Sequence, residues 1–136
     1  EVVPDIHVAL WDKFLFVVGW GGVGAVTRAP VGVLRELPQT QGLLRQSMTE
    51  IAVLAKARGV NLPADQVEKS LGFLNTLPPE GTTSMQRDIM EGKPSELESW
   101  NGAVVRLAKE SGVAVPLHEF VYSSLLPQEH AARTGG

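Results

Sequence analysis

Residues 8–26 read VALWDKFLFVVGWGGVGAV and are the most apolar stretch of this 136-residue chain. The stretch approaches the length of about 20 residues that a membrane-spanning helix needs. However, Asp12 and Lys13 lie inside it, four glycines fall between residues 19 and 24, and neither flank carries an excess of Lys and Arg. These properties argue against a membrane span. We therefore predict a buried helix in a globular domain, with no membrane partner.

The glycines of this stretch also match a dinucleotide-binding pattern, because Gly19, Gly21 and Gly24 have the spacing G-x-G-x-x-G. That motif requires a strand before it, a helix after it and a second parallel strand, all within about 30 residues. The segment that follows carries Pro30, and the residues beyond it have the pattern of a helix. We predict no cofactor-binding residue here. The glycines are expected to let a neighbouring helix or a substrate approach closely.

The composition of the chain limits the classes of function. Its length and its 43% of hydrophobic residues fit a single folded domain over residues 1–136. The formal charge is −3, and no basic run or alternation of basic and aromatic residues indicates a nucleic-acid partner. The chain has no cysteine, and His7, His118 and His130 have no acidic or histidine partner at the spacing of metal ligands. We predict no metal site.

The spacing of apolar residues and the positions of Pro and Gly predict an all-α fold of six or seven helices. Pro127 is expected to stop the last helix, and residues 128–136 are expected to form a frayed tail. Beyond the first helix and a short helix capped by Thr82 or Thr83, the segments expected to be helical are a turn within 27–37 and residues 38–58, 61–78, 96–111 and 116–126.

The segment 81–102 contains two expected helix starts and most of the candidate polar side chains. After the threonine cap, Ser84 lies in the first turn of a helix, where free backbone N–H groups can hold a carboxylate. Asp88 follows four residues later on the same helix face, so both side chains can contact one ligand. The alternatives are a helix start without a ligand for Ser84, and solvent or a basic neighbour for Asp88.

The second helix start is expected after Gly92 and Pro94. Ser95 and Glu98 have the spacing of a capping box, which gives Glu98 a structural role. Glu96 is expected in the first turn, where the helix dipole favours its ionised form and its oxygens can accept hydrogen bonds from ligand hydroxyls. The alternative for Glu96 is a carboxylate that only stabilises the helix start.

Two further charged residues have alternative roles. Lys13 lies in an apolar run beside Trp11 and Phe14, so its ammonium group either extends into solvent or faces a cleft. Glu50 lies on the helix expected over residues 38–58. We interpret Glu50 as structural support, with a solvated surface carboxylate as the alternative.

Several motifs resemble those of the C-terminal domain of the ketopantoate reductase (2-dehydropantoate 2-reductase) family, and they occur in the same order. They are W-x-K at residues 11–13, S-M-Q-x-D-I at 84–89 with Glu96 twelve residues after the serine, N-G-x-V-V-x-L-A at 101–108, and G-V-x-V-P at 112–116. The resemblance covers about residues 8–126. It implies an all-helical substrate domain with a fold similar to the C-terminal domain of 6-phosphogluconate dehydrogenase.

The resemblance also implies a function. In that family the helical domain follows an N-terminal Rossmann domain that binds NADPH, and the active site lies between the two. Lys13 would then be the general acid that protonates the ketone oxygen of a 2-oxo acid, either ketopantoate or a similar compound. Ser84 would bind the substrate carboxylate and Glu96 its hydroxyls. Asp88 is a further candidate for substrate contact because of its spacing to Ser84, not because of the resemblance.

The N-terminal Rossmann domain is not part of this chain, so we expect the isolated 136 residues to turn over no NADPH. The resemblance implies a cytoplasmic enzyme of pantothenate biosynthesis. We expect that apolar surface facing the missing domain favours a homodimer.

The chain departs from the family at two positions on the Lys13 face of the first helix. The family usually has asparagines four and eight residues after this lysine, whereas this chain has Val17 and Gly21. An apolar wall at these positions suggests a different 2-oxo acid, unless polar groups from elsewhere replace the amides. The alternative function is a catalytically inactive helical module for interaction or dimerisation, derived from such a domain.

Overall fold

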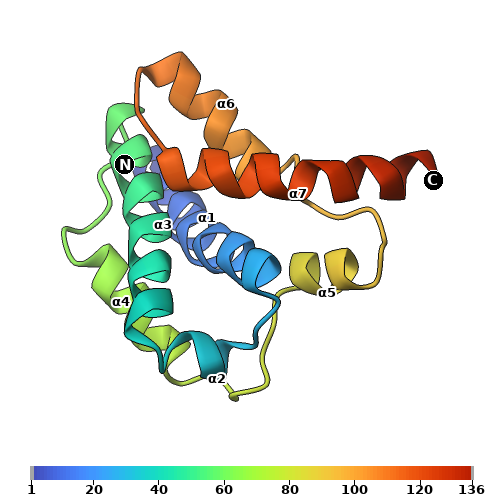
Figure 1. The fold of residues 1–136 in the computed structure, drawn as a ribbon. Helices are drawn as coiled ribbons and strands as arrows, with labels where there is room; N and C mark the ends of the chain where they lie inside the picture. The colour runs from blue at the N-terminus through green and yellow to red at the C-terminus, as the bar shows by residue number, and fades with distance from the viewer. Residues whose placement is uncertain (1, 136) are drawn as a thin grey trace.

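A computed structural model describes residues 2–135 of the chain, with side chains from residue 7 onward. Figure 1 shows α1 in the middle of the molecule, α3 beside it, α5 near its C-terminal end and α7 crossing it. The described residues contain no strand, so the predicted all-α fold is confirmed. The helices of this range are α1 (Val2–Thr27), α2 (Val31–Leu34), α3 (Pro38–Ala57), α4 (Gln66–Leu74), α5 (Ser84–Met90), α6 (Asn101–Ser111) and α7 (Pro116–Thr134).

Helix α1 is the centre of the core because its glycines let other elements approach. A Cβ atom at Gly19 would lie 2.5 Å from Cγ of Met48 on α3, and one at Gly22 would lie 2.6 Å from Nδ2 of Asn101 at the start of α6. Real Cβ atoms do not come this close to other atoms, so larger residues would force these helices apart. The predicted helix over residues 8–26 is confirmed, and its buried part includes all four glycines.

By length and composition alone, the segment His7–Thr27 of α1 could also cross a membrane. However, 50% of its most apolar window is buried inside the domain, where α3, α5 and α7 pack against it. The core helix of a helical domain meets the same criteria. Its position in this fold is that of a core helix.

Helix α4 is shorter than the segment 61–78 that the sequence predicts. It begins at Gln66 and ends at Leu74. Arg35, from the segment after α2, donates hydrogen bonds from Nη1 to the carbonyls of Leu74 (2.9 Å) and Leu77 (2.8 Å). These carbonyls at the end of α4 are therefore satisfied by a distant side chain, which the local sequence does not reveal.

The predicted capping box of Ser95 and Glu98 is wrong. The Ser95 N–H donates to the carboxylate of Glu129 on α7 instead, at 3.1 Å to each oxygen, and the Ser95 hydroxyl accepts from the N–H of Leu97. The Glu98 carboxylate accepts a hydrogen bond from the hydroxyl of Tyr122, also on α7, at 2.5 Å. Tertiary hydrogen bonds from α7 therefore replace the local cap.

The predicted end of the last helix is also wrong. Helix α7 contains Pro127 and continues to Thr134. Residues 128–134 are therefore helical, whereas the sequence predicts a frayed tail from residue 128 onward. Glu129 lies beyond the proline and is only 3% exposed, because it is hydrogen-bonded to Ser95. A proline removes one helical N–H, and the buried contacts of Glu129 hold the next two turns in place.

Glu50 supports the fold, as interpreted from the sequence. It lies on α3, is 8% exposed, and accepts hydrogen bonds from the backbone N–H groups of Leu117 (3.0 Å) and His118 (3.1 Å). These are unpaired donors in the first turn of α7, so Glu50 caps that helix from a distance. The alternative of a solvated surface carboxylate is wrong.

His118 is fully buried between α3, α6 and α7. Its Nδ1 accepts from the amide of Asn101 (3.1 Å), so Nε2 carries the hydrogen and donates to the carbonyl of Ser47 (2.9 Å). Burial lowers the pKa of His118 below its ordinary value of 6.5, although the Ser47 carbonyl and the Glu50 carboxylate oppose this effect. The imidazole is therefore neutral in the folded protein at neutral pH.

This lowered pKa predicts acid sensitivity. The unfolded state takes up a proton on His118 below about pH 6.5 while the folded state resists it, so the free energy of unfolding falls as the pH drops below that value. Urea unfolding measured between pH 5 and pH 8 tests the effect. His118→Gln should flatten this dependence, whereas His130→Gln, at an exposed histidine of α7, should retain it. An equal slope in wild type and His118→Gln would contradict the assignment.

Candidate functional site

Lys13 lies on an exposed position of α1 and lines a groove of about 340 Å³. No Asp or Glu among residues 7–135 lies within ion-pair distance of its ammonium group. Lys13 thus faces a cleft while remaining open to solvent. The side chains that line this groove, which we call the lysine groove, are Leu10, Lys13, Phe14, Val17, Val18 and Trp100.

Trp100 forms the wall of the lysine groove opposite α1, and the sequence did not single it out. Its ring packs on Gly21, where a Cβ atom would lie 2.8 Å from Cζ3 of the indole. An asparagine at position 21 would therefore collide with Trp100. The only local signal for this role is a large aromatic residue directly before the Asn101-Gly102 pair.

A second, mostly apolar groove of about 290 Å³ adjoins the first. It lies between α1 and α6 and shares Leu10 and Phe14 with the lysine groove. Leu10 is 62% exposed, which is unusual for a leucine of a core helix. The lining residues of this second groove are Leu10, Trp11, Phe14, Ala103 and Leu107.

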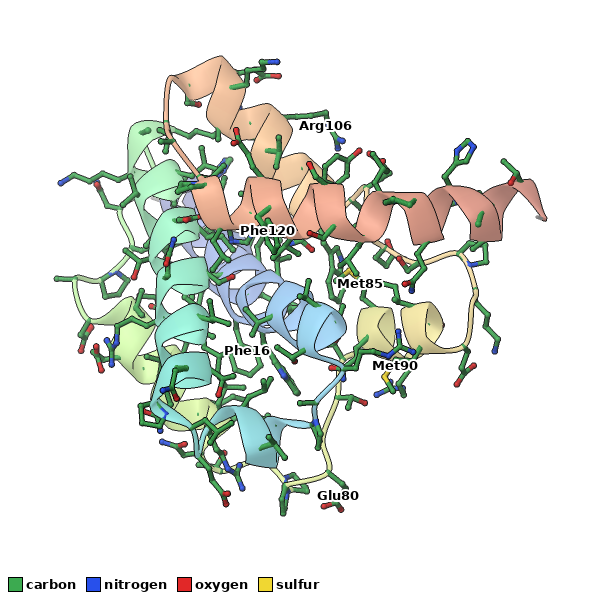
Figure 2. All side chains as sticks on the ribbon, viewed as in Figure 1. Phe16, Glu80, Met85, Met90, Arg106 and Phe120 are labelled. Carbon is green, nitrogen blue, oxygen red and sulfur yellow. The ribbon has the colours of Figure 1, made fainter. Side chains whose placement is uncertain are left out.

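Helix α5 carries Ser84 and Asp88, as predicted. Thr83 is its N-cap, and the Thr83 hydroxyl accepts the N–H of Gln86 at 3.2 Å. Ser84 is the exposed first residue of the helix, and Asp88 is half-buried one turn later. Met85, between them, points into the core under α7 (Figure 2). Ser84 and Asp88 therefore share the more exposed face of α5, beside its buried residues Met85, Gln86 and Ile89.

Glu96 lies in a turn before α6 rather than in the first turn of that helix. Helix α6 begins at Asn101, five residues later, so the expected stabilisation of Glu96 by the helix dipole is wrong. The Glu96 side chain is exposed, and its backbone carbonyl accepts the backbone N–H of Trp100 at 2.9 Å. One turn of backbone thus links Glu96 to the wall of the lysine groove.

Two segments of the candidate site meet α1 at Gly21. Gly21 lies two turns after Lys13 and contacts both Trp100 and Met85, the neighbour of Ser84. The segment with Glu96 and the start of α5 therefore both adjoin α1 at Gly21, two turns from Lys13. None of the hydrogen bonds or ion pairs among residues 7–135 joins Lys13, Ser84, Asp88 or Glu96 to another of the four.

This arrangement of helices and motifs matches a known family. A sequence profile described as Ketopantoate reductase PanE/ApbA C terminal matches residues 5–129, which is most of the chain. The chain belongs to the ketopantoate reductase family. It corresponds to the C-terminal helical domain of that family, and the resemblance inferred from the sequence is confirmed.

Known ketopantoate reductases are similar over nearly all of this domain. The 2-dehydropantoate 2-reductase of Aquifex aeolicus is 33% identical in an alignment of 133 positions that covers 92% of this chain and 41% of that protein. The enzyme of Pyrobaculum aerophilum is 28% identical over 135 residues, 99% of this chain and 48% of that protein. The structure of a dimeric ketopantoate reductase from Staphylococcus aureus has a TM-score of 0.87 at 28% identity, covering 93% of this chain and 44% of that chain. This chain spans less than half the length of these relatives.

The glycines of α1 do not form a dinucleotide-binding loop. The glycines with G-x-G-x-x-G spacing lie inside α1, so they offer no loop of free backbone N–H groups for a diphosphate. The side chains that cover Gly19, Gly21 and Gly24 are Met48, Trp100 and Gln86, respectively. Between residues 7 and 135 there is also no group of three or more His, Asp or Glu side chains placed to hold a metal ion.

Proposed function

We propose that this domain binds a 2-oxo acid and donates the proton in its NADPH-dependent reduction to a 2-hydroxy acid. The observation that carries the proposal is Lys13, an ammonium group without an ion-pair partner among residues 7–135, at a groove of a ketopantoate reductase domain. Such a group can protonate a ketone oxygen in the adjoining groove, and a positioned general acid accelerates the reaction substantially.

A reduced nicotinamide, held by a Rossmann domain outside this chain, would supply a hydride to the carbonyl carbon while Lys13 supplies the proton to the oxygen, leaving an alcohol and an oxidised nicotinamide. On α5, Ser84 would bind the substrate carboxylate, with Asp88 contacting the same ligand. Glu96 would accept hydrogen bonds from substrate hydroxyls. The motif positions of Ser84 and Glu96 support their assignment, and the spacing of Asp88 to Ser84 supports the third.

The proposed partners follow from the same assignment. The N-terminal Rossmann domain would close the exposed apolar groove beside Leu10 from its solvent side, which leaves the groove itself to the substrate. A second copy of the protein would complete a homodimer, by analogy with the dimeric ketopantoate reductase of Staphylococcus aureus. We place the whole protein in the cytoplasm.

The experiment that tests the proposal is NADPH oxidation by the full-length protein with ketopantoate and a panel of other 2-oxo acids. Turnover of at least one compound would support it. A folded protein that binds NADPH but reduces none of them would favour the inactive interaction module. The isolated 136-residue chain should show no turnover, and saturable NADPH oxidation by this chain alone would contradict the assignment of the cofactor to another domain.

A further inference from the structure

The chemical character of the lysine groove is more specific than the proposed reaction. Lys13 is its one charged lining residue, and the other lining side chains are aliphatic or aromatic. Val17 on α1 and Trp100 both belong to this apolar lining. A ligand atom that lies deeper in the groove than the Lys13 ammonium group would therefore meet mainly hydrocarbon.

The apolar surface continues beyond the lysine groove. Leu10 and Phe14 line both grooves, so the second groove extends the first toward Ala103 and Leu107 on α6. All five lining residues of the second groove are apolar or aromatic. The two grooves together form one apolar trough that starts at Lys13.

We propose that the 2-oxo acid reduced at Lys13 carries a bulky apolar side chain, aliphatic or aromatic, that lies in this trough, with Val17 and Trp100 as specificity-determining residues. The inference rests on the proposed function. The transfer of an apolar substituent from water to such a surface is favourable, because it lowers the free energy of the complex. A hydroxyl group in the trough would lose its hydrogen bonds to water without finding a partner there, because Glu96, the proposed acceptor for substrate hydroxyls, is not among the lining residues.

Trp100, which forms the wall of the lysine groove opposite α1, is held in place by its contacts with the rest of the fold. The Trp100 ring lies against the backbone of Gly21, and the Trp100 backbone N–H donates to the Glu96 carbonyl at 2.9 Å. The ring also packs against both apolar clusters of the core. A fixed wall discriminates between substrates better than a mobile one, because it does not rearrange around the wrong ligand.

The test compares substrates in the full-length protein. The kcat/KM for the 2-oxo acids of leucine and phenylalanine should be at least about tenfold higher than the kcat/KM for ketopantoate, which carries a hydroxyl group. Val17→Thr, which adds a hydroxyl group at nearly constant shape, should reduce this preference severalfold, mainly through KM for the apolar substrates. Val53→Thr, at an exposed valine of α3, is the matched control and should leave the preference unchanged.

A second readout does not require turnover. Binding is measured by tryptophan fluorescence. The 2-hydroxy acids of leucine and phenylalanine should bind at least about tenfold more tightly than pantoate. Val17→Thr should weaken the binding of these two compounds but not that of pantoate. Preference for ketopantoate, or a preference that Val17→Thr and Val53→Thr change equally, would overturn the inference while leaving the reductase assignment intact. Absence of turnover and of binding for every compound would overturn both.

Discussion

Replacing Lys13 by alanine is expected to lower kcat of the full-length protein by about 10²–10⁴-fold, the usual contribution of a general acid. Without the ammonium group, the oxygen that gains charge as the hydride arrives must take its proton from water. Because Lys13 is exposed on α1, the substitution should change the free energy of unfolding by no more than about 0.5 kcal/mol. Steady-state kinetics with the best 2-oxo acid and a urea titration measure the two effects separately.

Lys109→Ala is the matched control, because Lys109 is also an exposed lysine but lies on α6, outside both grooves. This variant should retain wild-type kcat and KM. If Lys13→Ala keeps kcat within about threefold of wild type, Lys13 is not the proton donor, since even a modest general acid contributes more than this. An equal loss in both variants would point to a general effect of surface charge.

The parts of the fold that the sequence predicts are those that depend on local chemistry. The apolar run around Lys13 predicts α1, and the crowding of glycines predicts its close contacts. The threonine cap and the four-residue spacing of the apolar residues Met85 and Ile89 predict α5. In each case the residues that decide the structure lie within one or two turns of each other, so pattern and propensity are sufficient.

Two of the errors have a different cause, because both involve Glu129, a partner far from Ser95 in the sequence. The Ser95 N–H has a local acceptor in the sequence pattern, Glu98, but its acceptor in the structure is Glu129. Pro127 is a local stop signal, yet α7 continues because the residues after it are anchored elsewhere. A single sequence does not reveal contacts of this range.

In the candidate site, too, local sequence signals predict some residues, whereas others depend on long-range contacts. Motif positions and helix spacing predict Lys13, Ser84, Asp88 and Glu96 as candidates, but not the surface that surrounds them. Trp100 becomes part of the site only because the fold places it on Gly21, 79 positions earlier in the chain. The side chains that define the size and polarity of the groove therefore require the structure, whereas the group that would perform the chemistry does not.

The contact between Ser95 and Glu129 also predicts the largest effect on stability. Glu129→Gln is expected to lower the free energy of unfolding by about 3 kcal/mol, because it removes a charged acceptor from buried donors and turns an amide group toward them. The Glu129 carboxylate accepts from the N–H of Ser95 (3.1 Å), from the Ser95 hydroxyl (2.6 Å) and from Nε of Arg133 (2.6 Å). Arg133 is about half exposed, so most of the effect belongs to the Ser95 hydrogen bonds.

The pH dependence of the same variant separates this mechanism from a simple packing defect. Burial alone would raise the pKa of Glu129, but the hydrogen bonds from Ser95 and the Arg133 guanidinium outweigh it and lower the pKa below the ordinary 4.5. The stabilisation is therefore complete above about pH 4.5 and is lost as the pH falls through the lowered pKa. The difference in unfolding free energy between wild type and Glu129→Gln should shrink in that range, whereas a packing defect would keep it constant. Glu119→Gln, at an exposed carboxylate of α7, is the control and should change the free energy of unfolding little both above and below about pH 4.5.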